Sequence, residues 1–201
     1  MCLPAGAGGQ DTGARTATRD GTWAGEMTTL RELLLHDLGQ LLAVERRLAS
    51  ALATLSEEAH DPELRRAFAR HRDETRRHAA DVERAFELLG EAPLEQRSAG
   101  IEGIVGEQRD FLAARRPAAI VLDMFLTGVA ARAEHYEICV YEGVVGAARM
   151  MGENEATELL QRNLDDEHEA LAGVMRISER LTAQSLRRRQ GVTGSIAERL
   201  P

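Results

Sequence analysis

Three glutamates lie in the middle of segments whose other residues repeat with the spacing of a buried helix face. Glu45 interrupts a row of leucines that recurs every three or four residues, and Glu167 interrupts a second such row. Glu134 lies in a third row, with Glu137 about one turn further along the same face. An ionised carboxylate removed from water is costly unless it is paired or bound to a metal. This pattern predicts an interior cluster of acids that binds cations.

A fourth apolar row is interrupted by two histidines and another glutamate. His71, Glu74 and His78 lie within about 60° of one another on a helix that turns about 100° per residue. Oxygen ligands with one or two imidazoles suit iron or manganese, and helix bundles hold pairs of such ions in this way. We therefore expect two iron ions, or two manganese ions, bridged by Glu74 and Glu167. The expected metal ligands are Glu45, His71, Glu74, His78, Glu134, Glu137 and Glu167.

Each of these side chains also has a simpler explanation. A single glutamate in an apolar row often reaches solvent at the edge of that row, and His71 and His78 could each hydrogen-bond a carboxylate. Tyr141, on the Glu134 face, could pack in the core or hydrogen-bond a ligand. The alternative function is therefore a metal-free helical module whose interior acids are protonated or hydrogen-bonded and whose outer face mediates dimerisation.

Prolines and glycines divide the chain into the helices that must position these side chains. Pro62 and Pro117 stand at the start of periodic segments, where a helix tolerates proline, and Gly90 and Gly152 stand at the end of such segments. Four long helices are expected, at 28–58, 62–89, 117–151 and 154–184, with a short one at 101–112. The predicted fold class is an all-α four-helix bundle with an extra short helix in the crossover between the second and third long helices.

The remaining segments lie at the two ends of the 201-residue chain. Residues 1–26 lack periodicity, so we expect a disordered extension, and Met27 could be the true start of the protein. The bundle is expected at 27–184 and a flexible tail at 185–201.

Charge and composition exclude several classes of function. The 25 basic residues, all arginines, are outnumbered by 33 acids, and the net charge of −8 argues against nucleic-acid binding. The two cysteines, Cys2 and Cys139, exclude a disulfide framework and suit a reducing cytoplasm. No stretch approaches the roughly 20 apolar residues that a membrane span needs. We therefore expect a cytoplasmic protein with no membrane or nucleic-acid partner.

Several segments together are similar to one known family. Residues 41–48, 71–75, 133–138 with Tyr141, and 164–167 resemble the YciE/YciF family of ferritin-like proteins. The resemblance implies a ferritin-like bundle with an added helix, ferroxidase activity in the stress response, and a homodimer. It also implies Glu45, Glu74, Glu134 and Glu167 as metal carboxylates, with Glu137 as a further candidate. The Glu-x-x-His spacing of other ferritin-like proteins would need a histidine at 77, where Arg77 stands.

The last residues resemble a different kind of signal. Residues 191–198, a Gly-Ser-aliphatic run after an arginine-rich segment, are similar to the tails that load ferritin-like proteins into encapsulin shells. We therefore expect residues 191–200 to be able to bind such a shell. The alternative is a final helical turn in which Ser195 and Glu198 form a capping box.

Overall fold

The computed structural model describes residues 16–17, 23–24 and 26–197, with side chains from 26 to 187. Two short strands, β1 (Thr16–Ala17) and β2 (Trp23–Ala24), pair antiparallel with Thr16 opposite Ala24. No regular structure was expected in this part of the sequence. The rest of the predicted disordered extension lies outside the described residues.

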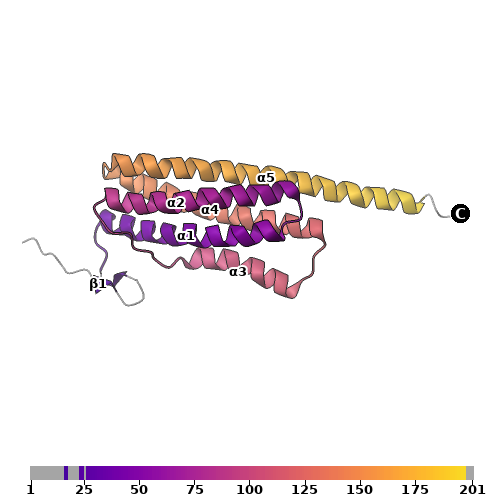
Figure 1. The fold of residues 1–201 in the computed structure, drawn as a ribbon, viewed down its shortest axis with the longest axis horizontal. Helices are drawn as coiled ribbons and strands as arrows, with labels where there is room; N and C mark the ends of the chain where they lie inside the picture. Colours follow the sequence, from indigo (N-terminus) through magenta and orange to yellow (C-terminus); the bar gives the residue numbers. More distant parts are fainter. Residues whose placement is uncertain (1–15, 18–22, 25, 198–201) are drawn as a thin grey trace, which may run out of the picture.

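Five helices make up the remainder of the described chain: α1 (Leu30–Glu58), α2 (Pro62–Leu88), α3 (Ala99–Ala114), α4 (Ala119–Met150) and α5 (Asn154–Ala197). The four long helices lie side by side, and the shorter α3 covers the bundle on the side of α1 and α4 (Figure 1). The predicted all-α bundle, with a short helix in the connection between the second and third long helices, is therefore confirmed. None of the described helices has the length and apolar composition needed to cross a bilayer.

Local signals in the sequence explain where these helices begin and end. The Thr29 hydroxyl accepts a hydrogen bond from the Glu32 amide at 3.2 Å, and the Glu32 carboxylate accepts one from the Thr29 amide at 3.0 Å. This reciprocal pair satisfies amides that have no partner within α1. Gly90 and Gly152 follow α2 and α4 with φ of +74° and +77°, a conformation that favours glycine.

The last helix is longer than expected. α5 continues past residue 184, where its predicted end lay, to Ala197, and extends beyond the other helices of the bundle (Figure 1). Glycine in a helix interior costs only about 1 kcal/mol relative to alanine, and no proline occurs between Pro117 and Pro201. The last helix therefore ends 13 residues later than predicted, the flexibility of the tail from 185 stays a prediction, and residues 198–201 lie outside the described residues.

Among the described residues, a polar layer lies between two of the three apolar clusters of the bundle, and the third lies beneath α3. One cluster takes Leu42 from α1 and Leu164 from α5, and the other takes Leu52 and Val174 from the same two helices. Between these positions each long helix carries buried polar side chains: Glu45, His71, His78, Glu134, Glu137 and Glu167. The fold therefore places the candidate ligands in the middle of the molecule, with apolar residues above and below.

A buried carboxylate on α4 holds the short connection between α1 and α2. The Asp123 carboxylate accepts hydrogen bonds from the backbone amides of His60, at 2.7 Å, and Asp61, at 3.0 Å. Asp61 in turn accepts from the amides of Glu63 and Leu64 and so caps α2. Asp123 thus fixes the angle at which α2 leaves α1 and returns along the bundle.

We predict that Asp123→Ala lowers the free energy of unfolding by about 2–4 kcal/mol, because it leaves two partly buried amides without a charged acceptor. Urea denaturation followed by circular dichroism measures this change. The control is Asp110→Ala, whose side chain is 77% exposed and whose effect should stay within about 0.5 kcal/mol. Equal stability of the two variants would contradict the anchoring role.

Candidate metal centre

Six ionisable side chains from the four long helices form the polar layer, and each is at most 7% exposed. They fall into two groups that could each hold a metal ion. Site A contains His71, Glu134, Glu137 and Glu167, and site B contains Glu45, His78 and Glu167. Glu167 belongs to both sites, so a single carboxylate lies between two sets of donor atoms.

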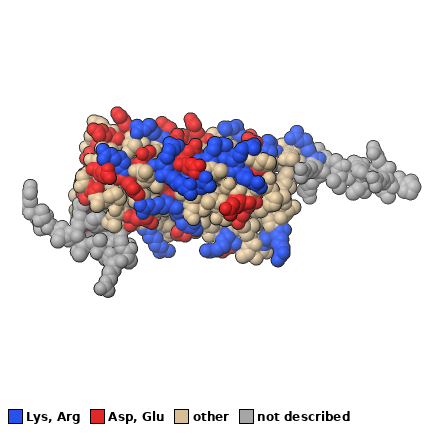
Figure 2. All heavy atoms as spheres, in the orientation of Figure 1, with Lys and Arg blue, Asp and Glu red and all other residues tan. Residues whose placement is uncertain are grey.

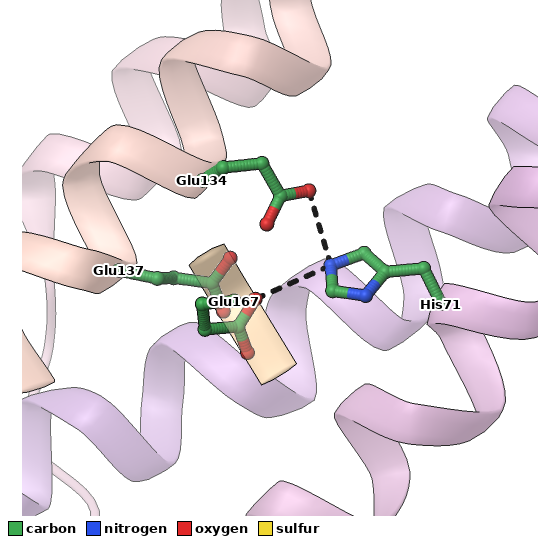
Figure 3. Close-up of side chains that lie close together, drawn as sticks. All are labelled: His71, Glu134, Glu137 and Glu167. Atoms are coloured by element: carbon green, nitrogen blue, oxygen red, sulfur yellow. Dashed lines mark ion pairs between the residues drawn. The ribbon is translucent and has the colours of Figure 1, made fainter. Parts of the chain in front are cut away.

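In site A the His71 imidazole faces the acids of two neighbouring helices (Figure 3). Its Nε2 atom lies 3.1 Å from Glu134 Oε1 and 3.5 Å from Glu167 Oε2. Glu137 lies close to Glu167 in the same view, with both carboxylates inside the bundle. One imidazole nitrogen and three carboxylates therefore point toward a common centre.

In site B the second imidazole faces the other side of Glu167. His78 Nδ1 lies 2.7 Å from Glu167 Oε1 and 3.9 Å from Glu45 Oε1. The Tyr141 hydroxyl donates a short hydrogen bond to Glu45 Oε1 and accepts one from Asn163 Nδ2 at 3.2 Å. The sequence left open whether Tyr141 packs or hydrogen-bonds, and the structure shows both: it is fully buried and it holds Glu45.

The structure does not bring Glu74 into the interior with the other predicted ligands, and its role as a bridging ligand stays a prediction. Its side chain is 39% exposed, and Glu74 belongs to neither site. The reason is helix phase: at about 100° per residue, His78 lies about 20° from His71 around the helix, whereas Glu74 lies about 60° away. Helix α2 therefore contributes two imidazoles to the interior, and Glu74 contacts His71 Nδ1 from outside at 3.5 Å.

Several carboxylate oxygens of the polar layer accept no hydrogen bond. Among the described residues, these are both oxygens of Glu137 and of Glu167 and the Oε2 atoms of Glu45 and Glu134, although Glu167 keeps its ion contacts with His78 and His71. Buried polar atoms are normally hydrogen-bonded, and a group of exceptions requires an explanation. Six carboxylate oxygens that accept no hydrogen bond, beside two imidazoles, match the donor set of iron or manganese. The residues present therefore fit a pair of such ions.

Burial raises the pKa of most of these carboxyls. Burial and the neighbouring Glu167 raise the pKa of Glu45 to about 8. Burial also raises the pKa of Glu134 to about 7, although the nearby His71 opposes the shift. Burial and three surrounding acids hold the pKa of Glu137 well above its usual range. Without a cation, the layer therefore retains protons at neutral pH.

Ion pairs between the two histidines and the acids shift the pKa values of His71, His78 and Glu167. Burial opposes a charge on His78, but Glu167 and Glu45 outweigh it and raise its pKa to about 9. Burial likewise opposes a charge on His71, whose pKa Glu134 nevertheless raises well above the usual value. The pKa of Glu167 is lowered, because contacts with His78 and His71 outweigh its burial. Glu167 is thus the interior acid best prepared to carry a negative charge.

Two supporting side chains were not among the predicted site residues. Asp166 Oδ2 lies 3.2 Å from His78 Nε2, on the side of the ring away from Glu167, and Asn163 holds Tyr141. A carboxylate on the second nitrogen fixes the orientation of a metal-binding imidazole. Both residues lie within four positions of Glu167 on α5, so their proximity to the predicted ligand was the available signal.

A pocket of about 280 Å³ connects site A with solvent between α2 and α5. His71 and Glu134 form part of its wall, and five acids in all outnumber two arginines along it. On the face drawn in Figure 2, acidic and basic side chains are interspersed over the described residues. The acidic lining of the pocket favours cations over anions.

Comparison with known proteins places this chain in a family. Residues 29–187 match the family described as "Domain of unknown function (DUF892)", and the chain belongs to this family. The match spans all five helices except the last turns of α5.

Individual relatives agree with this assignment. Protein YciF of Escherichia coli (strain K12) is 26% identical over 142 residues, which cover 70% of this chain and 85% of YciF. The crystal structure of the E. coli stress protein YciF matches with a TM-score of 0.74 at 23% identity, and the match covers 78% of this chain and 99% of that chain. YcfI of Rhodopseudomonas palustris has a TM-score of 0.71 at 27% identity, covering 74% and 94%. The predicted resemblance to the YciE/YciF family is therefore confirmed.

We predict that the melting temperature of the metal-free protein falls as pH rises from 6 to 9. Folding raises the pKa of Glu45 from 4.5 to about 8 and that of His78 from 6.5 to about 9, so the folded protein keeps protons that the unfolded chain releases. Each retained proton lowers stability by about 1.4 kcal/mol per pH unit, or about 3–5 °C. Scanning calorimetry after chelation measures the slope.

The matched variants for this measurement are Glu45→Gln and Glu142→Gln. Glu45→Gln removes one retained proton and should make the slope shallower, whereas Glu142, exposed on the same bundle, should leave it unchanged. A melting temperature that is constant or rises between pH 6 and 9 would show that the interior acids are not protonated.

Proposed function

We propose that this protein is a ferroxidase-type oxidoreductase that binds two Fe(II) ions in sites A and B and oxidises them with dioxygen or peroxide. The observation that supports the proposal is the position of Glu167, a buried carboxylate that belongs to two adjacent groups of histidine and glutamate. Bridging carboxylates of this kind hold paired metal ions in helix bundles.

Charge balance supports two divalent ions in particular. The polar layer contains four buried glutamates: Glu45, Glu134, Glu137 and Glu167. Fully ionised, they carry four negative charges, which two divalent cations neutralise while both histidines stay neutral. One cation would leave the layer with an excess of charge in a medium where isolated charge is costly. Cation binding also replaces the protons that the acids otherwise retain.

Each side chain has a defined part in this proposal. Glu134 and Glu137 supply oxygens to site A, Glu45 supplies them to site B, and Glu167 serves both. Tyr141 and Asp166 hold Glu45 and His78 in place. Fe(II), the substrate, supplies the electrons: two ions reduce one dioxygen, with two protons, to hydrogen peroxide, or one hydrogen peroxide, with two protons, to two waters.

The proposed cellular role is iron and oxidant detoxification under stress in the cytoplasm. YciF of Escherichia coli carries the description of a stress protein. Oxidation of Fe(II) removes a reactant that damages cells together with peroxide. Manganese in the same ligand set would support peroxide dismutation instead, since the donor atoms suit both metals.

We predict that anaerobic Fe(II) loading followed by oxygen gives a near-ultraviolet ferric absorbance, and that Glu45→Ala and Glu134→Ala slow its appearance. Removal of residues that only orient ligands costs about 10–100-fold in metal affinity or activity, so loss of a ligand should cost at least tenfold. Stopped-flow absorbance measures the rate. Glu142→Ala on the exposed face of α4 is the control and should match the parent.

The iron-loaded parent protein and its variants also test the metal-free alternative. In that alternative the bundle is an interaction module of the stress response, and its outer face forms a homodimer. Elemental analysis after iron reconstitution should give about two equivalents per chain if both sites fill. Less than one equivalent, or variants that oxidise iron as fast as the parent, would favour the interaction module.

We further propose an encapsulin shell as a partner of the chain's last residues. The backbone of α5 extends beyond the other helices (Figure 1), so the part of the signal at 191–197 would be held away from the bundle. Deletion of residues 191–201 should abolish association with a coexpressed shell protein and leave iron oxidation unchanged. Native mass spectrometry of both forms measures association, and undiminished shell binding after deletion would contradict the proposal.

A further inference from the structure

The pocket between α2 and α5 has room for more than the site A ligands at its floor. Its volume is about 280 Å³, whereas a divalent ion with six water molecules needs roughly 180 Å³ at about 30 Å³ per water. Small residues on its walls leave this space open: Ala67, Ala130, Ala170 and Gly173. We call this space the acidic pocket, and it is large enough for a hydrated cation.

The charges on the wall of the acidic pocket suit such a cation. Two of its acids, Glu63 and Asp166, already form ion pairs with arginines, at 3.0 Å and 3.7 Å. Glu74 on α2 and Glu169 on α5 also line the pocket, and among the described residues neither is paired with an arginine. The Glu74 side chain is 39% exposed and Glu169 is exposed, so both carboxylates can bind the water molecules of an ion. Carboxylates bind hard divalent cations that keep part of their water in this way.

Two buried polar atoms at the floor of the acidic pocket also lack a hydrogen-bond partner among the described residues. They are His71 Nδ1 and Glu134 Oε2, in side chains of the pocket wall that are 7% and 3% exposed. His71 Nε2 faces the acids of site A, so Nδ1 is the nitrogen on the side of Glu74, whose Oε2 atom lies 3.5 Å away. Buried polar atoms normally bond to protein or to ordered water. The water molecules of a cation in the pocket would supply both missing partners.

We propose that the acidic pocket is a third cation site, which binds a hydrated divalent cation between Glu74 and Glu169 and supplies site A with its ion. The acidic wall attracts the cation from solvent, and His71 and Glu134 at the floor bind it as it loses water. Because this ion keeps its water, it is held more weakly than the two ions of the polar layer. Its use as an entry site rests on the proposed iron oxidation, but occupancy of the pocket does not.

Anomalous scattering from manganese tests occupancy directly. Crystals of the full-length protein soaked in excess Mn(II) should show a peak between Glu74 and Glu169, outside site A. Glu169→Gln should remove this peak and keep those of the polar layer. The control is Glu158→Gln, the same change at an exposed position on α5 outside the pocket, which should keep every peak.

The outcomes of this experiment separate the two proposals. A parent protein with no ion in the acidic pocket would overturn the third site, whether or not the polar layer is filled. An ion in the pocket of a protein whose polar layer stays empty would support the third site and refute the ferroxidase proposal.

The rate of metal loading tests whether the third site supplies site A. In stopped-flow loading with Co(II), followed by its visible absorbance, Glu74→Gln and Glu169→Gln should each slow binding several-fold, because each removes a charge that attracts cations. The slowing should diminish at high salt, and the final stoichiometry should match the parent. Equal slowing by Glu158→Gln and Glu169→Gln would overturn the entry role. Loss of bound Co(II) at equilibrium in Glu74→Gln would overturn the part given to Glu74 and make it a ligand of the polar layer.

Discussion

Four carboxylates and two imidazoles share the centre of this bundle, and the electrostatic cost of placing them there shapes the surrounding structure. Apolar clusters close the layer above and below, and burial together with the neighbouring Glu167 raises the pKa of Glu45 to about 8 and that of Glu134 to about 7. The interior therefore has two ways to reduce its charge, by retaining protons or by binding cations. Competition between protons and cations for the same oxygens links stability, metal affinity and pH in one equilibrium.

The elements around the layer differ in what they contribute to it. Helix α2 presents imidazoles to the interior and an acid, Glu74, to its edge, and Asp166 on α5 contacts the outer nitrogen of His78 in a similar way. The acidic pocket lies on this side of the molecule. On the side of α3 the same carboxylates lie against mainly aliphatic side chains. The layer thus has a solvent-connected acidic pocket on one side and an apolar wall on the other.

Much of the fold followed from the sequence because its signals are local. Pro62, Gly90 and Gly152 mark helix ends through backbone geometry, and the row of leucines around Glu45 identifies a buried face. The sequence did not place Glu74 because a residue about 60° from His71 around the helix can face either the interior or its edge, and packing decides which. Asp123 accepts hydrogen bonds from two backbone amides that are more than 60 positions away in the sequence. No local sequence pattern could therefore reveal that Asp123 holds the connection between α1 and α2.

The central claim is that the buried acids hold two cations with Glu167 between them. Anomalous scattering at the iron edge, from crystals loaded with Fe(II) without oxygen, tests it most directly. The account predicts two peaks, one among His71, Glu134 and Glu137 and one between Glu45 and His78, with the Glu167 carboxylate adjacent to both. Iron bound only to exposed acids, or no peak within the polar layer, would contradict it.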